Sequence, residues 1–507
     1  MGSSSMPPTP AIADAERQAA RTVPQGASSR CPRPATIVLA LTLLAAALRF
    51  GTLDVQSIWL DESATILLVH RGFAGMLSHL PSSESAPPLY YVLVWAWTKI
   101  FGLGPLGFRS FSALMGTLTI PVIYLVGKRV SVRVGLWAAA LAAVSPVLYY
   151  YSQEARGYAL LILLSTAAFL AWQHALREPT IRKLAWWSGL SALALLTHYF
   201  AVFVFLPEAA VLIRRVSWRK SSSAIAPVAI VGLALVPLAL RQRGGGQSDW
   251  IQTTSLLSRF AQAPKQFLVG LYSPLEIFSA ALAGILAAMA VWLLVVRGNA
   301  RERRHARDVT IVAVGALAIP LLLAVTHLQD VFNGRNVMAA WAPWAVLVAS
   351  GLGIARAGRI GALLGASLCA ISLLVILATD TNPGYQREDW RGVSRSLGSP
   401  TSERVLVTEQ NGLLPLDVYL PRVSPIHGLS VSTREVAFIG LPTARTGRAP
   451  LAAVVPMTAP TGFRLAEVHR TGTYAISRFI ATKEQSVSQD ALRRAIKEPT
   501  AEVLLQP

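Results

Sequence analysis

Two adjacent carboxylates are the first residues of this sequence whose types and spacing could do chemistry. Asp61 and Glu62 stand in the segment WLDES, residues 59–63, shortly after an apolar run. Neighbouring carboxylates can divide the work between a general base and a group that orients a substrate or binds a cation. A divalent cation, Mg²⁺ or Mn²⁺, would find its ligands in the same pair. The structural alternative places both acids in the first turn of a helix over 63–80, where negative charge is favourable.

A second cluster gathers tyrosines, an acid and an arginine within ten residues. The segment 149–158 reads YYYSQEARGY and contains Tyr151, Glu154, Arg156 and Tyr158. Tyrosine rings favour the membrane interface, which is the structural explanation for them. The planar fork of Arg156 suits the oxygens of a phosphate. Glu154 is a candidate cavity residue or simply the ion-pair partner of that arginine.

Three further polar positions lie at the ends of apolar runs. His198 and Tyr199 close one run, and a histidine in this place is more often a structural hydrogen-bonding group than a ligand or base. Arg335 opens another run and is a second candidate for an anionic headgroup, with an interface anchor as the alternative. Arg49, near the end of the first run, either extends toward the interface or faces the same cavity.

Composition identifies the solvent of this chain as a bilayer. Of 507 residues, 53% are hydrophobic and 14% are charged, whereas soluble domains carry about a quarter charged residues. The net charge of +20 resides in short basic clusters between apolar runs. Such clusters anchor cytoplasmic loops, so we expect no nucleic-acid partner. Cys31 lies in a polar tail and Cys369 in an apolar run, which predicts neither a disulfide nor a metal site.

The apolar runs predict a polytopic α-helical membrane protein with about 11–13 transmembrane helices. A membrane span needs about 20 mostly apolar residues. The segment 87–102 is apolar but short, so we interpret it as a partly embedded or re-entrant helix that lines a cavity. The candidate spans are 36–53, 110–127, 135–151, 158–176, 184–200, 201–213, 224–240, 274–296, 309–327, 336–355 and 360–379.

Basic clusters predict the orientation of these spans. With the arginine-containing tail inside, five later clusters all fall on the cytoplasmic side. Their segments are 128–133, 177–183, 214–220, 297–308 and 355–359. The N-terminus is then cytoplasmic, in a plasma or inner membrane. The first loop, 54–86, and the candidate residues near 152–157, 198–199 and 328–336 then lie on the outer face.

The hydropathy profile divides the chain into three parts. Residues 1–34 are rich in Ser, Pro, Ala and Arg, which predicts a disordered cytoplasmic tail. The membrane domain follows over 35–379, and its first apolar run is an uncleaved anchor rather than a signal peptide cleaved at 45–47. Residues 380–507 carry short β-like runs and a helix near 390–397. They predict a small soluble α/β domain on the extracytoplasmic side.

An ordered set of motifs then resembles a known superfamily. The chain is similar to GT-C glycosyltransferases, in the branch of the dolichyl-phosphate-mannose protein mannosyltransferases and the bacterial aminoarabinose transferases of lipid A. The resemblance extends over about 49–352. Its motifs are WLDE (59–62), ESAPPLYYVLVWAWTKIFG (84–102), FRSFSALMGTL (108–118), YYSQEARGYALL (150–161), THYFAVFVFLPE (197–208) and FNGRN (332–336).

The resemblance implies a mannosyltransferase-like enzyme that uses a polyprenyl-phosphate sugar on the outer face, with inversion at the anomeric carbon. The acceptor would be an extracytoplasmic glycan, lipid or protein. Asp61 would act as general base or orient the acceptor, and Glu62 would help to position the acceptor or a cation. Arg156 and Arg335 would hold the donor phosphate, and Arg49 is a third candidate for that role. The residues expected to line the cavity are Glu84, Tyr90, Tyr151, Glu154, Tyr158, His198 and Tyr199.

Two other functions compete with the enzyme. A transporter or lipid flippase would place ionisable groups near the middle of the membrane, on broken helices. Here the ionisable groups cluster at one face, which argues against transport. A non-catalytic scaffold of the same fold would act through residues 380–507, but Asp61 and the arginines are all present.

Overall fold

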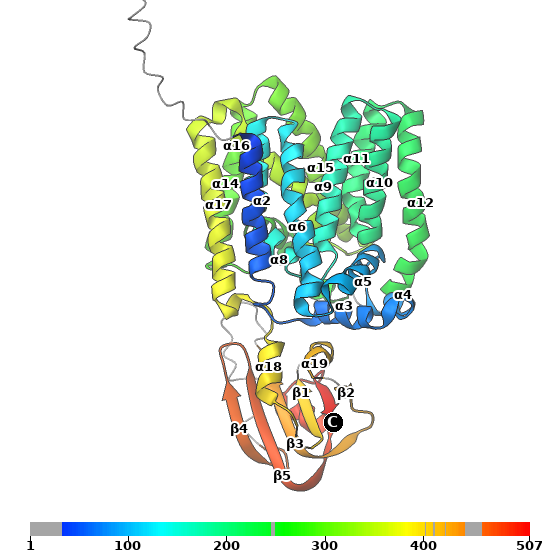
Figure 1. The fold of residues 1–507 in the computed structure, drawn as a ribbon, viewed down its shortest axis with the longest axis vertical. Helices are drawn as coiled ribbons and strands as arrows, with labels where there is room; N and C mark the ends of the chain where they lie inside the picture. The colour runs from blue at the N-terminus through cyan, green and yellow to red at the C-terminus, as the bar shows by residue number, and fades with distance from the viewer. Residues whose placement is uncertain (1–32, 245–248, 401, 409–410, 421, 442–458) are drawn as a thin grey trace, which may run out of the picture.

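The computed structural model describes residues 33–244, 249–400, 402–408, 411–420, 422–441 and 459–507. The predicted tail, 1–34, lies almost wholly outside these residues, as does Cys31. The described chain forms a bundle of helices with a smaller α/β domain at one end (Figure 1). We call the end of the bundle next to that domain the domain end, and the opposite end the far end.

Long apolar helices build the bundle, and each predicted span overlaps one of them or, for 135–151, a bent pair. This pair is α7 and α8, which meet at an angle of 55°. The helices are α2 (Pro34–Gly51), α6 (Pro105–Lys128), α7 (Val132–Ala143), α8 (Pro146–Ser152), α9 (Tyr158–Arg177), α10 (Ile181–Thr197), α11 (Val202–Arg215), α12 (Trp218–Arg243), α14 (Glu276–Arg297), α15 (Ala300–Val325), α16 (Trp341–Gly353) and α17 (Gly358–Thr381). The prediction of a polytopic helical membrane protein is confirmed.

The number of helices that qualify as spans is smaller than predicted. Within the described residues, eight helical segments are long and apolar enough to cross a membrane, or nine if the bent pair counts as one span. Helices α10 and α11 run beside the others but have only 17 and 14 residues. The predicted count of about 11–13 included the shorter apolar runs 184–200 and 201–213.

Shorter helices cover the domain end. They are α3 (Leu60–His70), α4 (Gly72–Ser83), α5 (Leu89–Phe101) and α13 (Leu256–Val269). Helix α5 lies within the predicted re-entrant segment 87–102 and is 13 residues long, too short for a membrane crossing. It lies at the domain end beside α3 and α4, and α6 starts again from that end (Figure 1). Short 3₁₀ helices complete the bundle: η1 (Tyr199–Ala201), η2 (Asp249–Thr253), η3 (Gly334–Ala340) and η4 (Ala355–Ala357).

The basic loops meet at the far end. Arg177 Nη2 donates to the carbonyl of Arg129 over 2.9 Å. Arg215 forms a bidentate pair with Asp308, at 2.5 and 2.7 Å. These contacts join four of the five basic loops that the charge pattern assigns to one side of the membrane.

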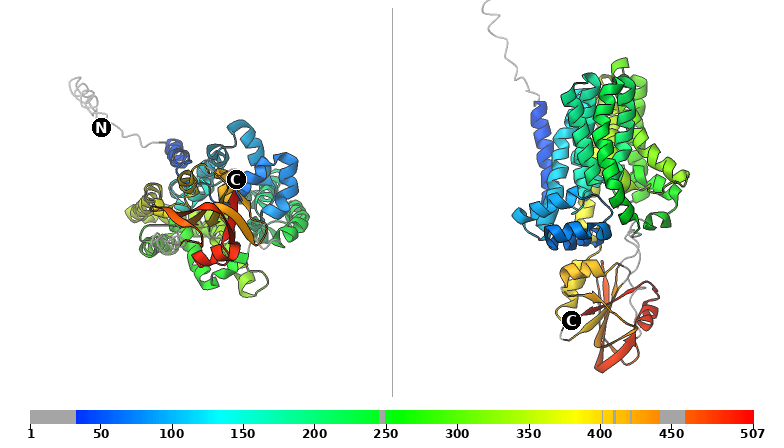
Figure 2. Two further views of the ribbon diagram at one scale, coloured as in Figure 1. Left: turned by 90° about the horizontal axis from the view of Figure 1, so that it is seen from below. Right: turned by 90° about the vertical axis from the view of Figure 1, so that its right-hand side faces the viewer.

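Among its described residues, the α/β domain is a six-stranded sheet flanked by short helices. The strand order is β2-β6-β1-β3-β5-β4, in which β1 and β3 are parallel and the other neighbours are antiparallel. Figure 2 shows the sheet beyond the end of the bundle. Its elements are η5 (Pro383–Tyr385), α18 (Trp390–Leu397), β1 (Arg404–Thr408), α19 (Leu413–Tyr419), β2 (Ser424–Pro425), β3 (Ser430–Gly440), β4 (Arg464–Arg470), β5 (Ala475–Ser488), α20 (Gln489–Ile496) and β6 (Glu502–Gln506).

The domain docks on the first loop of the bundle. Ser57 Oγ donates to Asp389 Oδ1 over 3.0 Å, and the amide of Ile58 donates to the Tyr419 hydroxyl over 2.7 Å. Because these contacts involve the residues just before α3, the domain helps to fix the start of the helix that carries Asp61 and Glu62.

Candidate active site

Glu62 forms a buried ion pair with Arg109 in which both carboxylate oxygens already have partners. Helix α3 begins at Leu60, so both acids lie in its first turn. Glu62 is fully buried, and its two oxygens accept from Arg109 Nε and Nη2 over 2.7 and 2.6 Å. The amide of Ala155 donates to the same carboxylate over 2.9 Å. Burial by itself raises the pKa of Glu62, but Arg109, together with Arg387 and the Ala155 amide, outweighs it and the net pKa is lowered. This position differs from the expected role in acceptor or cation binding, because the carboxylate oxygens are already occupied.

Arg109 ties the first loop to α6. Besides Glu62 it donates to the carbonyl oxygens of Leu53, Gln56 and Ser57, all within 2.8 Å. Our sequence interpretation did not single out this arginine. The available signal was its position in the first turns of an apolar span, where a charged residue requires a specific partner.

Asp61 faces a different group and keeps part of its side chain exposed. Its Oδ2 accepts from Arg335 Nη1 over 2.9 Å, and the two side chains are 20% and 26% exposed. The guanidinium of Arg335 also stacks on Trp250, with 4.1 Å between the guanidinium carbon and the ring centre. Two predicted residues that lie far apart in the chain therefore meet in one accessible ion pair.

The turn before η3 holds Arg335 in this position. Arg259 of α13 forms a bidentate pair with Asp330 at 2.6 and 2.7 Å and donates to the carbonyl of Phe332 over 2.8 Å. Asn333 Oδ1 accepts the amide of Arg335 over 3.1 Å. The FNGRN segment is thus fixed on both sides by hydrogen bonds, which limits the positions open to the Arg335 side chain.

Arg156 reaches the same region from the loop between α8 and α9. Its Nη1 donates to Glu84 Oε2 over 2.6 Å and to the Asp61 carbonyl and Thr65 Oγ1 over 3.2 Å each. Burial raises the pKa of Glu84, and the positive charge of Arg156 only partly opposes this shift. Arg156 and Glu84 therefore form a buried ion pair beside the partly exposed Asp61.

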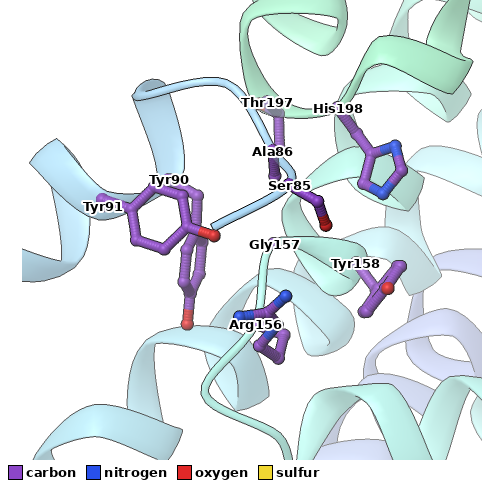
Figure 3. Close-up of a pocket in the computed structure, with 9 residues that line it drawn as sticks. All are labelled: Ser85, Ala86, Tyr90, Tyr91, Arg156, Gly157, Tyr158, Thr197 and His198. Atoms are coloured by element: carbon purple, nitrogen blue, oxygen red, sulfur yellow. The ribbon is translucent and has the colours of Figure 1, made fainter. Parts of the chain in front are cut away.

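A small polar pocket adjoins Arg156. Figure 3 shows Arg156 below Ser85, with His198 and Tyr158 on one side and Tyr90 on the other. Burial, followed by the charges of Arg156 and Arg335, lowers the pKa of His198 to about 3. The imidazole is therefore neutral near pH 7 and can orient a ligand by hydrogen bonding, but it cannot supply a proton as an imidazolium.

The remaining predicted tyrosines occupy two different places. The Tyr151 ring packs on that of Tyr158, with 4.6 Å between the ring centres, and so extends the pocket wall. Tyr199 instead donates to Gln242 Oε1 over 2.7 Å. Its hydroxyl thus contacts α12, and Tyr199 does not line the polar pocket beside His198.

Arg49 holds the backbone at the bend between α7 and α8. It is fully buried and donates to the carbonyls of Ala142 and Ala143 over 3.1 and 3.0 Å, and to Ser152 Oγ over 3.1 Å. These carbonyls belong to the last turn of α7, whose own hydrogen bonds end there. The expected role of Arg49 in phosphate binding does not match this geometry, because its guanidinium is committed to backbone oxygens.

Glu154 is a buried carboxylate with few partners. It is 1% exposed, and its closest cation is Arg387, with 4.0 Å from Nη2 to Oε2. Burial raises its pKa to about 7, which Arg387 partly opposes and Asp61 and Glu62 reinforce. The charge state of Glu154 therefore changes close to neutral pH. Arg387 lies beyond the last span and was not predicted as a site residue.

Comparisons with known proteins support one assignment. The family model of the dolichyl-phosphate-mannose-protein mannosyltransferases matches residues 85–240. ArnT from Cupriavidus metallidurans in the apo state aligns with a TM-score of 0.54 at 12% identity, over 88% of this chain and 98% of that chain. The chain therefore shares the fold of this ArnT structure, and part of its bundle matches the mannosyltransferase family model. ArnT bound to undecaprenyl phosphate aligns with a TM-score of 0.52 at 12% identity, over 87% of this chain and 97% of that chain. A comparison with curated protein sequences finds no match.

The helical bundle also carries an apolar cavity of about 850 Å³ that is partly open to its surroundings. Helices α13 to α17 line it almost entirely with aliphatic and aromatic side chains, among them Phe267, Trp292 and Trp344. Phe332 lines it as well, three residues before Arg335. One short turn therefore contacts the apolar cavity and also presents the cation that pairs with Asp61.

The described residues contain no group of three or more His, Cys, Asp or Glu side chains that could hold a metal ion. The two acids of the first turn are engaged by arginines, Asp61 by Arg335 and Glu62 by Arg109.

Proposed function

We propose that this protein is a membrane glycosyltransferase that transfers a sugar from a polyprenyl-phosphate donor to an acceptor hydroxyl at the domain end. The turn at 332–336 carries the proposal. Phe332 lines the 850 Å³ apolar cavity, and Arg335 pairs with Asp61 at 2.9 Å. A lipid-linked sugar phosphate has a long apolar tail, an anionic group and a reactive carbon in that order. The cavity, the arginine and the carboxylate follow the same order.

The chemistry needs only groups that are present. The donor phosphate would draw the guanidinium of Arg335 away from Asp61, since a phosphate offers it the same bidentate contact as a carboxylate. Arg335 then neutralises charge that develops on the leaving phosphate. Asp61, released from its arginine, accepts the proton of the acceptor hydroxyl while that oxygen attacks the anomeric carbon. The bond from that carbon to the phosphate oxygen breaks with inversion, and the polyprenyl phosphate leaves with the electron pair.

Other groups would shape the pocket for the sugar. Arg156, Tyr158 and neutral His198 line a polar space next to Asp61 and can hydrogen-bond sugar hydroxyls. The solved structure of ArnT with undecaprenyl phosphate supports a prenyl phosphate as the lipid. A mannose-like hexose agrees with the matched family model, and a pentose would also fit the same chemistry.

The location follows from the charge pattern. The basic loops meet at the far end, so the positive-inside rule assigns that end to the cytoplasm of a plasma or inner membrane. The domain end, with the pocket and the α/β domain, would then be extracytoplasmic. The acceptor is accordingly a glycan, lipid or protein outside the cytoplasm. A divalent cation is not needed for this mechanism, and adding EDTA to the assay tests whether one takes part.

The experiment is a transfer assay with purified protein and a panel of radiolabelled polyprenyl-phosphate sugars. The release of sugar to water or to an acceptor is measured for wild type, Asp61→Asn and Asp54→Asn. Asp54 is an exposed acid of the same loop, paired with Arg391, and serves as the matched control. We expect one donor to react and Asp61→Asn to lose about 10²- to 10⁴-fold in kcat. The proposal fails if wild type turns over no donor faster than a heat-denatured sample.

A further inference from the structure

Arg387 of the segment that leads into the α/β domain is buried inside the membrane part of the protein. It follows η5 and precedes α18, yet its side chain is only 2% exposed. Its guanidinium carbon lies 4.4 Å from the ring centre of Tyr150 and 5.7 Å from that of Trp59. Its backbone amide donates to Gln56 Oε1 over 3.3 Å. The side chain thus enters between the first loop and the loop after α8.

The polar contacts of the guanidinium are with carboxylates and backbone carbonyls of these two segments. Nη1 lies 3.6 Å from Glu62 Oε2, and Nη2 lies 4.0 Å from Glu154 Oε2. It also donates to the backbone carbonyls of Gln153 and Tyr150 over 3.1 and 3.4 Å. Glu62 has Arg109 as well, but Glu154 has no closer cation among the described residues. Arg387 therefore supplies the nearest compensating charge for Glu154 and fixes the backbone beside it.

We infer that Arg387 is a positioning residue through which the α/β domain orders the active site. Arg387 holds the last turn of α8 and the loop after it, which we call together the loop 150–157. This segment also carries Arg156, whose guanidinium contacts Glu84 and the Asp61 carbonyl. A shift of the loop therefore moves both a wall of the polar pocket and the start of α3. The effect on transfer rests on the proposed function, whereas the effect on the order of the loop does not.

A neighbouring arginine offers a matched control. Arg391 also links the domain to the first loop, with 2.8 Å from Nη2 to Asp54 Oδ1. Its partner is 58% exposed and its contacts do not include the loop 150–157. Substituting Arg391 therefore removes a bridge between the same two parts but leaves the acidic cluster intact.

The first test is hydrogen–deuterium exchange of the full-length protein in detergent, without substrate. Wild type, Arg387→Met and Arg391→Met are compared for peptides that cover 150–157. We expect faster exchange over this loop in Arg387→Met only, because the segment loses the anchor at its Tyr150 and Gln153 carbonyls and its own amides then open more often. Equal protection in both variants overturns the inference.

The second test is steady-state kinetics with the donor found in the transfer assay. We expect Arg387→Met to lower kcat about 10²-fold, the loss that a small misplacement can cause, with little change in the KM of the donor. Arg387→Lys should recover at least about tenfold, since it keeps the charge near Glu154 but not the fork to both carbonyls. Arg391→Met should stay within about twofold of wild type. A rise in the KM of the donor alone, with kcat unchanged, would contradict the role of Arg387 as a positioning residue.

A double variant keeps the test decisive if Arg387→Met does not fold. Removing one partner leaves an uncompensated buried carboxylate, so Arg387→Met/Glu154→Gln removes both charges. We expect the double variant to be folded but still less protected over 150–157 than Glu154→Gln alone. Equal protection in these two variants overturns the inference. If wild type turns over no donor, the proposed function fails and the exchange experiment still judges the role of Arg387.

Discussion

The two ends of the bundle both carry arginine–carboxylate pairs, but in opposite surroundings. At the domain end, Arg109 and Glu62 are 1% and 0% exposed and are joined to several backbone groups. At the far end, Arg215 and Asp308 have similar bidentate geometry but are 41% and 18% exposed. A buried charge depends on its own partner, whereas an exposed one has water as an alternative.

This difference separates two uses of the same residue type. The net charge of +20 is mostly a property of loops at the far end, where the number of basic residues matters more than the position of any one. At the domain end, Arg109, Arg335 and Arg387 each have a specific geometric task. Charge counting therefore predicts topology, while the site depends on individual contacts.

The largest expected effect is on stability, from Arg109→Met at the domain end. The substitution leaves Glu62 buried without its main counterion and three carbonyls without a donor. Breaking a buried pair in this way costs about 3–5 kcal/mol. We expect a large fall in the midpoint of thermal aggregation in detergent. Arg109→Met/Glu62→Gln should recover part of it, and a double variant no more stable than the single one would contradict this explanation.

Arg335→Met should act on the reaction rather than on the fold. Arg335 is half-buried and pairs with an accessible carboxylate, so its loss leaves no deeply buried charge. Losing one charge-assisted contact to the donor phosphate corresponds to about 1.5–3 kcal/mol, or roughly 10- to 100-fold in kcat/KM. Arg241→Met, an exposed arginine of α12 near the same end, is the control. A melting temperature that falls as far as in Arg109→Met would show that Arg335 is structural.

The separation of the basic loops at one end from the candidate site at the other could largely be predicted from the sequence. Apolar runs of about 20 residues and basic loops are local signals, so the helices and the common end of the loops follow from them. The same topology brings Asp61, Arg156, Arg335 and His198 to one end. These predictions succeed because each depends only on a short stretch of sequence and on the requirement that the chain crosses a bilayer.

The partner of each charge could not be predicted in the same way. Asp61 and Glu62 are neighbours in the sequence, and only the direction that each takes from the first turn of α3 gives one of them to Arg109 and the other to Arg335. Arg49 was assigned to a ligand because nothing nearby in sequence shows the free carbonyls at the end of α7. Arg387 lies in a polar linker whose burial depends on how the α/β domain docks.

Glu154 offers a pH test of burial at the domain end. Its pKa is about 7 in the folded protein and about 4.3 in an unfolded chain. The folded state binds the proton more tightly, so stability is highest below the unfolded pKa and falls as pH rises toward 7, by up to about 1.4 kcal/mol per pH unit. Between pH 5 and pH 7 the melting temperature of wild type should fall relative to Glu154→Gln. Parallel curves over that range would show that Glu154 is not buried as a poorly compensated acid.

The smallest effect should come from Arg215→Met at the far end, although its bidentate pair with Asp308 has shorter contacts than many at the domain end. Exposed pairs contribute about 0–1 kcal/mol because water replaces the lost partner and the long side chain regains its freedom. We expect a melting temperature within about 2 °C of wild type and unchanged transfer kinetics, measured beside Arg109→Met under the same conditions. A loss comparable to that of Arg109→Met would mean that geometry, and not burial, decides the strength of these pairs. The contrast between the two ends would then need another physical cause.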